Sequence, residues 1–169
     1  MRRFLTIALL MFIRINLWAS HIVGGEIFYT YEGSSGGNLS YTVTLNLFVD
    51  CNNGNPQSID QDKTASFNVF KVNSSNYTLY TSYALNNSRT GPVRVSDISY
   101  KCIKNIPDVC VDKYTYTVKM SLPSTALGYI ITFERCCRNS TTTNILNPGT
   151  TGATYWTKIP GSNLVANDN

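Results

Sequence analysis

The strongest constraint on the fold is an alternation of apolar and polar residues with a period of two. In residues 41–49 the apolar side chains fall at Tyr41, Val43, Leu45, Leu47 and Val49, and residues 42, 44 and 46 are polar. Successive side chains of an extended strand point to opposite faces, so this pattern predicts a half-buried β-strand. The same alternation recurs in residues 114–120 and 129–134, which we also predict as strands.

Further strand candidates alternate with clusters of Gly, Asn, Pro and Ser, the residues that turns require. The strand candidates are residues 22–31, 65–72, 77–85, 93–98 and 153–159. The turn clusters are residues 33–38, 52–56, 73–76, 86–88, 91–92 and 147–149. No segment of a dozen residues has a helical apolar period. We therefore expect an all-β antiparallel β-sandwich, immunoglobulin-like in general shape.

The first twenty residues have the layout of a secretory signal peptide. Arg2 and Arg3 form a positive start, residues 4–13 are apolar except for Thr6, and Ala19-Ser20 offers small residues for cleavage. The apolar run is shorter than the ~20 residues that a membrane-spanning helix needs. We expect residues 1–20 to be a cleaved signal peptide and the protein to be exported, to the cell surface or the extracellular space. An uncleaved membrane anchor is the alternative.

Residues 21–160 are expected to form one sandwich module, followed by a polar tail at residues 161–169. The whole chain carries 14 Lys+Arg and 10 Asp+Glu, but Arg2, Arg3 and Arg14 leave with the signal peptide, so the net charge falls from +4 to +1. Without a clustered basic face, nucleic acid is not an expected partner. No second long apolar stretch follows the signal, so no membrane span is expected after cleavage.

All five cysteines lie after the predicted signal, at Cys51, Cys102, Cys110, Cys136 and Cys137. An exported chain meets an oxidising compartment, so disulfides are the expected state and one thiol is left over. Cys102 and Cys110 are close in sequence, and we predict a bridge between them. The second predicted bridge joins Cys51 to Cys136 or Cys137. Adjacent cysteines on a strand face opposite sides, so only one of that pair would point to such a partner.

Four catalytic or metal-binding interpretations were compared with plain structural ones. Ile22-Val-Gly-Gly25 resembles the start of an activated serine protease, but the sole histidine, His21, precedes it and no triad can be assembled. A cysteine nucleophile meets the same lack of a base. Zinc is disfavoured because no Cys-x₂-Cys pair exists. Oxygen ligands from Asp50 to Asp62 only partly match a calcium loop, and a strand end with a turn is preferred there.

The carboxylates and aromatic residues leave two further possibilities open. Paired carboxylates for a hydrolase cannot be chosen from Glu26, Glu32, Asp97, Asp108, Asp112 and Glu134, which are scattered along the chain. Charged residues beside the cysteine pair, Glu134, Arg135 and Arg138, are expected to form surface ion pairs or to hold turns. Most of the 11 tyrosines are in phase with Val, Leu and Ile, which favours a core role. Outward tyrosines or Trp156 would instead form a sugar- or protein-binding face.

An ordered series of landmarks carries a family resemblance. The series consists of residues 20–27, residues 41–51, Cys102…Pro107…Cys110, residues 121–123, Gly128 to Asn139, Asn144-Ile145, residues 152–155 and Ile159-Pro160. It resembles the N-terminal module of large surface proteins of gliding bacteria, which often carry PKD or other immunoglobulin-like repeats. The resemblance implies an exported surface or adhesin-like module with a binding or structural role. A fragment, a truncated product and a stand-alone secreted paralogue remain alternatives for the extent of the chain.

The leading functional expectation is therefore a non-catalytic module of a cell-surface or adhesion protein, associated with gliding motility. Its partner would be an extracellular protein or glycan. It would need no cofactor or metal, and no catalytic residue is assigned. The second expectation is a secreted carbohydrate-binding module that uses exposed Tyr or Trp156, and the third is a secreted hydrolase with two acids facing one cleft.

Overall fold

The computed structural model describes residues 22–52, 66–85, 89–94, 110–136, 138–139 and 142–162. These residues form an all-β structure whose one helical element is a short 3₁₀ turn, η1. The predicted signal segment, residues 1–20, lies outside the described residues. The elements are β1 (Ile22–Ser35), β2 (Asn38–Asp50), β3 (Ser66–Val72), β4 (Tyr77–Ala84), β5 (Arg89–Arg94), β6 (Val111–Pro123), β7 (Tyr129–Arg135), η1 (Pro148–Thr150) and β8 (Ala153–Ile159).

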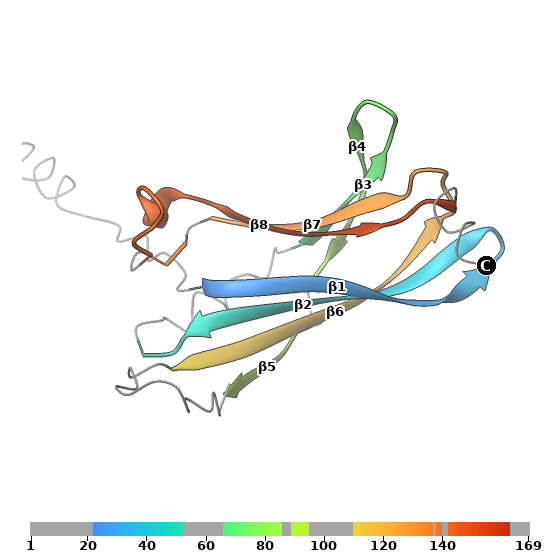
Figure 1. The fold of residues 1–169 in the computed structure, drawn as a ribbon. Helices are drawn as coiled ribbons and strands as arrows, with labels where there is room; N and C mark the ends of the chain where they lie inside the picture. The colour runs from blue at the N-terminus through green and yellow to red at the C-terminus, as the bar shows by residue number, and fades with distance from the viewer. Residues whose placement is uncertain are drawn as a thin grey trace, which may run out of the picture.

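The strands form two antiparallel four-stranded sheets that lie face to face. The first sheet has the order β1-β2-β6-β5 and the second has the order β4-β3-β7-β8. Figure 1 shows the β7–β8 layer lying over the β1–β2–β6 layer, with the β3–β4 hairpin rising at one side. The expectation of an all-β antiparallel sandwich is confirmed at this level.

The register of the first sheet explains why its sequence alternates. Strand β2 pairs with β1 on one side and with β6 on the other, and Leu45 stands beside Ile27 and Tyr116. Val43, Leu45 and Leu47 are fully buried, while the residues between them face the outer side of the sheet. On that outer side, Asn46 Nδ2 donates to Glu26 Oε1 over 2.7 Å and Thr115 Oγ1 donates to Asn46 Oδ1 over 2.7 Å. A buried amide is thereby satisfied on both of its polar ends.

The second sheet contributes the opposite half of the core. Phe67, Val69 and Ile131 are fully buried, and Phe133 is 2% exposed. The rings of Phe67 and Phe133 pack edge to face with centroids 6.5 Å apart. The two inner faces thus form a core of alternating side chains from both sheets, as two packed sheets require.

One predicted turn is instead part of a strand. Gly91-Pro92 was expected to form a turn between strands, but both residues lie inside β5, where the pairing with β6 skips from Thr90 to Val93. The expected strand at residues 93–98 begins earlier, and its residues 95–98 lie outside the described part. A proline is tolerated here because β5 is an edge strand and the irregularity removes the need for a backbone N–H at this position.

No helix of the described residues is long and apolar enough to cross a membrane.

Candidate functional site

A cleft of about 550 Å³ opens at one end of the sandwich. We call it the tyrosine cleft. It is lined by Tyr29, Tyr31, Leu39, Tyr41, Ser124, Ile159, Pro160 and Ser162. Its volume lies within the range of about 300–1,000 Å³ that is typical of small-molecule sites.

The cleft exists because the two sheets differ in length at this end. The β1–β2 hairpin turns at Gly36–Gly37, and in Figure 1 it runs beyond the end of β8. Side chains on the inner face of the hairpin would be core residues if β8 continued. Since β8 ends at Ile159, Tyr31 is left 54% exposed at the position where Tyr41 stands beside it. The same alternation that builds the core therefore supplies the cleft with tyrosine rings.

The tyrosine rings hold one another in fixed orientations. The rings of Tyr29 and Tyr41 meet edge to face, with centroids 5.6 Å apart and planes at 87°. Those of Tyr31 and Tyr41 are also 5.6 Å apart, with planes tilted by 54°. Tyr41 is buried at 6% exposure and Tyr29 is half-buried, so Tyr31 is the ring that solvent reaches most easily. Such edge-to-face and tilted contacts stabilise aromatic clusters and restrict ring motion.

The opposite wall of the cleft is built from backbone packed closely on backbone. Ser162 N–H donates to the Thr125 carbonyl over 3.0 Å, and Gly128 N–H donates to Thr125 Oγ1 over 3.1 Å. Gly128 has φ of +81°, and a Cβ there would overlap the Ile159 carbonyl oxygen. A Cβ on Gly161 would likewise overlap the Ala126 carbonyl oxygen. The two glycines therefore let the turn after β6 touch the chain after β8, which places Ser124 and Ser162 at the cleft.

The electrostatics of the tyrosine cleft favour neutral groups. None of the described side chains that line it is charged. Burial raises the pKa of the Tyr41 phenol, and the neighbouring Tyr29, Tyr31 and Tyr129 add to the effect. Tyr41 thus keeps its proton well into the alkaline range. Among the described residues, the hydroxyls of Tyr29, Tyr31 and Tyr41 make no hydrogen bond to protein, so they remain able to donate to a ligand.

The disulfides gather at the other end of the sandwich. Cys51 is bonded to Cys110, with the Cα atoms 5.2 Å apart. The predicted Cys102–Cys110 bridge is therefore wrong, and so is the predicted bridge from Cys51 to Cys136 or Cys137. The reason is the register, because Asp50 pairs with Val111 and the next residues outward are Cys51 and Cys110. Closeness in sequence misled the prediction, since pairing of β2 with β6 brings distant cysteines together.

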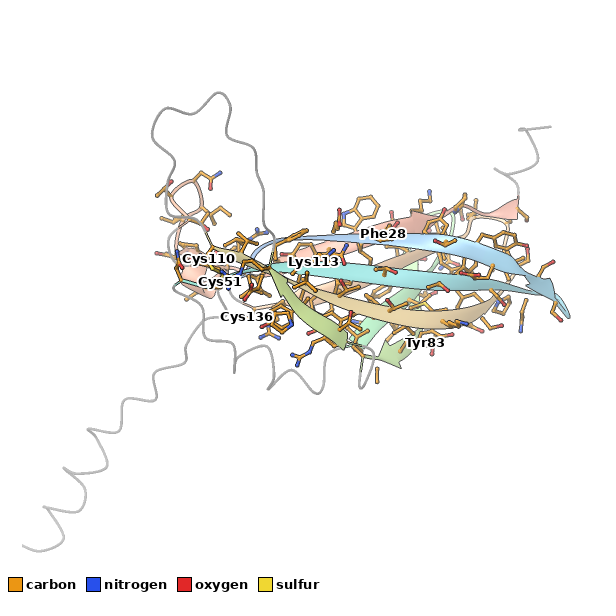
Figure 2. All side chains as sticks on the ribbon, turned by 90° about the horizontal axis from the view of Figure 1, so that it is seen from below. Phe28, Cys51, Tyr83, Cys110, Lys113 and Cys136 are labelled. Atoms are coloured by element: carbon orange, nitrogen blue, oxygen red, sulfur yellow. A yellow bond between two sulfur atoms is a disulfide. The ribbon has the colours of Figure 1, made fainter. Side chains whose placement is uncertain are left out.

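Cys136 is also disulfide-bonded, and its partner lies outside the described residues, as do Cys102 and Cys137. Figure 2 shows Cys51, Cys110 and Cys136 at the same end, away from the tip of the β1–β2 hairpin. All three cysteines within the described residues are thus oxidised, which is inconsistent with a zinc site built on their thiolates.

The Cys51–Cys110 disulfide lies beside an ion pair. Arg94 Nε stands 2.7 Å from Asp112 Oδ1, and its terminal NH1 approaches Cys110 Sγ at 2.6 Å. Arg94 is well exposed, so solvent weakens the pair and it contributes at most about 1 kcal/mol. Its guanidinium holds the edge strand β5 against the end of β6.

Two of the candidate carboxylates, Glu26 and Asp112, lie apart on the first sheet. Glu26 stands beside Asn46 and Thr115, whereas Asp112 stands beside Val49, three positions along the same strands. An odd offset puts the two carboxylates on opposite faces of the sheet. Asp97 and Asp108 lie outside the described residues.

Arg138 was expected to form a surface ion pair or to hold a turn. It holds a turn, because its Nε donates to the Gly152 carbonyl over 3.0 Å.

The proposed calcium loop is only partly within the described structure. Asp50 Oδ1 accepts the Asn52 N–H over 2.9 Å, which is the turn interaction that short polar side chains make after a strand. Residues 53–62 lie outside the described part. Within the residues that are described, no group of three or more His, Cys, Asp or Glu side chains is arranged to hold a metal ion.

Trp156, the sequence-based candidate for sugar stacking, lies on the opposite face of its sheet from the core. It is 61% exposed and stands beside Thr132, whose buried hydroxyl has no hydrogen-bond partner among the described residues. The structure does not bring Trp156 into the tyrosine cleft.

Among the tyrosines, the core role holds for Tyr41, Tyr114, Tyr116 and Tyr129, which are all buried. The sequence reasoning missed the cleft itself. The signal that it contained was the alternation of Ile27, Tyr29 and Tyr31, which is in phase with the core but extends past the last strand that could cover it.

Known proteins offer no match to the chain. No family model, no curated protein and no solved structure matches it.

Proposed function

We propose that this protein is an exported, non-catalytic recognition module of the cell-surface or adhesion type, which binds an extracellular protein or glycan through the tyrosine cleft. The observation that carries the proposal is the cleft, an open cavity whose described lining is uncharged and whose Tyr29, Tyr31 and Tyr41 hydroxyls make no hydrogen bond within the described part of the chain. The proposal includes an origin among gliding-associated surface proteins, for which the ordered Cys and Gly landmarks are the support. It also includes an immunoglobulin-like general shape, supported by two packed antiparallel sheets.

The disulfides support the exported location. Cytoplasmic thiols are kept reduced, and stable structural disulfides are typical of exported chains. The Cys51–Cys110 bond joins the ends of two central strands, so it is part of the scaffold. This is the compartment that the predicted signal at residues 1–20 would deliver the chain to.

The disulfide and the tyrosine cleft lie at opposite ends of the sandwich, and this arrangement supports recognition at the cleft. Cys51 follows Tyr41 by ten positions along β2, which at about 3.3 Å per residue places the disulfide roughly 33 Å from the cleft. The disulfide end is covalently fixed. The cleft end presents rings and hydroxyls on strands of the rigid scaffold, which is the arrangement that preorganises a binding site.

Export is tested by producing the full chain, with its N-terminal segment, in a bacterium that has an oxidising periplasm. We expect the protein in the exported fraction, starting at Ser20 or His21, with Cys51 and Cys110 blocked to thiol reagents. Retention in the cytoplasm with reactive thiols would refute this part of the proposal.

Recognition is tested with the exported protein on immobilised extracellular material, in separate protein and polysaccharide fractions. We expect binding to one fraction that is weakened by Tyr31→Ala and left unchanged by Tyr77→Ala. Tyr77 is the matched control because it is 62% exposed on β4 and does not line the cleft. Binding to neither fraction, or binding equally sensitive to both substitutions, would overturn the proposed role of the cleft.

A further inference from the structure

The chemistry of the tyrosine cleft narrows the class of ligand that it can hold. Its walls combine aromatic rings with Leu39, Ile159 and Pro160, and its polar groups are hydroxyls from tyrosine and serine. A ligand that fits has an apolar face and a rim of neutral hydrogen-bonding groups. Pyranose rings have this division, since C–H groups lie on the ring faces and hydroxyls project from the edge.

Charge argues against an ionic ligand. A carboxylate, sulfate or ammonium group placed among these walls would lose water without gaining a counter-charge from them, because the lining side chains that the structure describes are all neutral. Burial raises the pKa of the Tyr41 phenol, so this group stays a neutral donor and acceptor. Uncharged hydroxyls of a ligand would instead exchange hydrogen bonds with water for hydrogen bonds with Tyr29, Tyr31 and Tyr41.

Backbone pairing excludes strand addition on β2, whereas β1, which carries Tyr29 and Tyr31, is an edge strand of this sheet. Strand addition needs a free edge with unpaired N–H and C=O groups. At Leu39 and Tyr41 the backbone of β2 is already paired, with β1 on one side and β6 on the other. Strand β2 therefore contributes side-chain rings and hydroxyls to the cleft, but no unpaired backbone groups.

Ring geometry supplies a stacking surface. Tyr31 is 54% exposed, and its contact with Tyr41 at 5.6 Å fixes the tilt of the ring while leaving part of it open. A pyranose that packs on Tyr31 would have the Tyr29 and Tyr41 hydroxyls within the same cavity, with Ser124 and Ser162 on the opposite wall. The C–H face of the sugar then packs on the Tyr31 ring, and its hydroxyls lie near the hydroxyls of the tyrosines and serines.

We propose that the tyrosine cleft binds a pyranose unit of an uncharged glycan, stacked on Tyr31 and hydrogen-bonded by the tyrosine and serine hydroxyls. This inference rests on the proposed recognition function and names its ligand class. The cleft is open at its mouth, so the unit bound can belong to a longer polysaccharide.

The experiment measures affinity of the full exported chain for three probe sets. These are neutral oligosaccharides from β-glucan, mannan, xylan and galactan, then anionic oligosaccharides from alginate and polygalacturonate, and a proline-rich peptide. We expect binding to at least one neutral set, reduced about tenfold or more by Tyr31→Ala, a loss of the size found when an aromatic ring that stacks on a nucleic-acid base is removed. Tyr31→Phe keeps the ring and should lose less, while Tyr77→Ala and Trp156→Ala should bind as the parent does.

The outcomes separate failure of this inference from failure of the recognition function. Tyr31-dependent binding of only the anionic probes or the peptide overturns the neutral-glycan assignment and leaves recognition by the cleft standing. Neutral-glycan binding that depends on Trp156 and not on Tyr31 overturns the assignment of the glycan to the cleft. Absence of binding to every probe overturns the inference. Thermal melting of each variant shows that it is folded, which is expected because Tyr31 is more than half exposed.

Discussion

Cys51 and Cys110 face one another across the ends of two neighbouring strands. The Cys51 N–H donates to the Cys110 carbonyl over 3.1 Å, and the two sulfur atoms are bonded although the residues are 59 positions apart in sequence. The disulfide thus adds a covalent link next to the last β2–β6 backbone pair. In the unfolded chain the same bond closes a long loop.

Loss of this bond should destabilise the fold. For a loop of this length, the chain-entropy model gives about 4 kcal/mol of stabilisation. We expect the Cys51→Ala/Cys110→Ala double variant to lose that order of free energy of unfolding, measured by urea denaturation of the oxidised proteins. Peptide mapping of the unreduced parent should yield a Cys51–Cys110 linked pair, and a Cys102–Cys110 linked pair would contradict the structure.

The assignment of alternate β2 side chains to the core and to the outer face can be tested on two adjacent residues. Leu45 is fully buried and Thr44 lies on the outer face beside Phe28 and Thr117. We expect Leu45→Ala to lower the free energy of unfolding by about 2–5 kcal/mol through lost burial and the cavity that remains. Thr44→Ala should cost at most about 1 kcal/mol. Equal effects in denaturant titrations would contradict the assignment of Leu45 to the core and Thr44 to the outer face.

Gly128 fixes the wall of the tyrosine cleft. Its φ of +81° and the overlap of an added Cβ with the Ile159 carbonyl exclude a side chain there. We expect Gly128→Ala to cost about 1–3 kcal/mol from the left-handed backbone alone, with more from displacement of the chain after β8. Gly149→Ala is the control, because a Cβ on Gly149 meets no atom within 4 Å. A Gly128→Ala variant that melts like the Gly149→Ala variant would refute the close packing of this wall.

The Tyr41 phenol should make the fold sensitive to alkali. Burial raises its folded-state pKa, so the folded protein holds this proton more tightly than the unfolded chain does. The resulting stability is complete below the unfolded-state pKa of about 10 and is lost as pH rises from there through the folded-state pKa. We expect Tyr41→Phe to lose less stability than the parent between pH 8 and pH 11, compared by urea midpoints. Identical pH profiles would show that Tyr41 is not desolvated. Tyr129 and Tyr155, whose pKa values are also raised by burial, should contribute to the sensitivity that remains.

The strand pattern of the central strands was predictable because it is local. Val43, Leu45 and Leu47 alternate with polar residues, and period-two alternation directly reports which side of a strand is covered. The same held for Tyr129, Ile131 and Phe133 in β7. Gly91-Pro92 was misjudged because the same dipeptide suits a turn and an irregular edge strand, and only the position of β5 at the edge decides between them.

The disulfide partners and the cleft were not predictable because both depend on which distant segments meet. Cys110 is close to Cys102 in sequence, but the pairing of β2 with β6 places Cys51 opposite it. Likewise Tyr31 reads as one more core residue, and its exposure follows from the end of β8 at Ile159, more than a hundred positions away. Residues such as Ser124 and Ser162 carry no local sign of a site.

The most direct test of recognition by the cleft is an NMR titration of the full exported chain, carrying ¹³C-labelled tyrosine and tryptophan rings, with neutral hexasaccharides of β-glucan, mannan, xylan and galactan. We expect one of these sugars to shift the ring signals of Tyr31, Tyr29 and Tyr41 while Tyr77 and Trp156 stay in place. Shifts confined to Trp156 or Tyr77, or no ring shift with any of the four sugars at millimolar concentration, would contradict a glycan site in the tyrosine cleft.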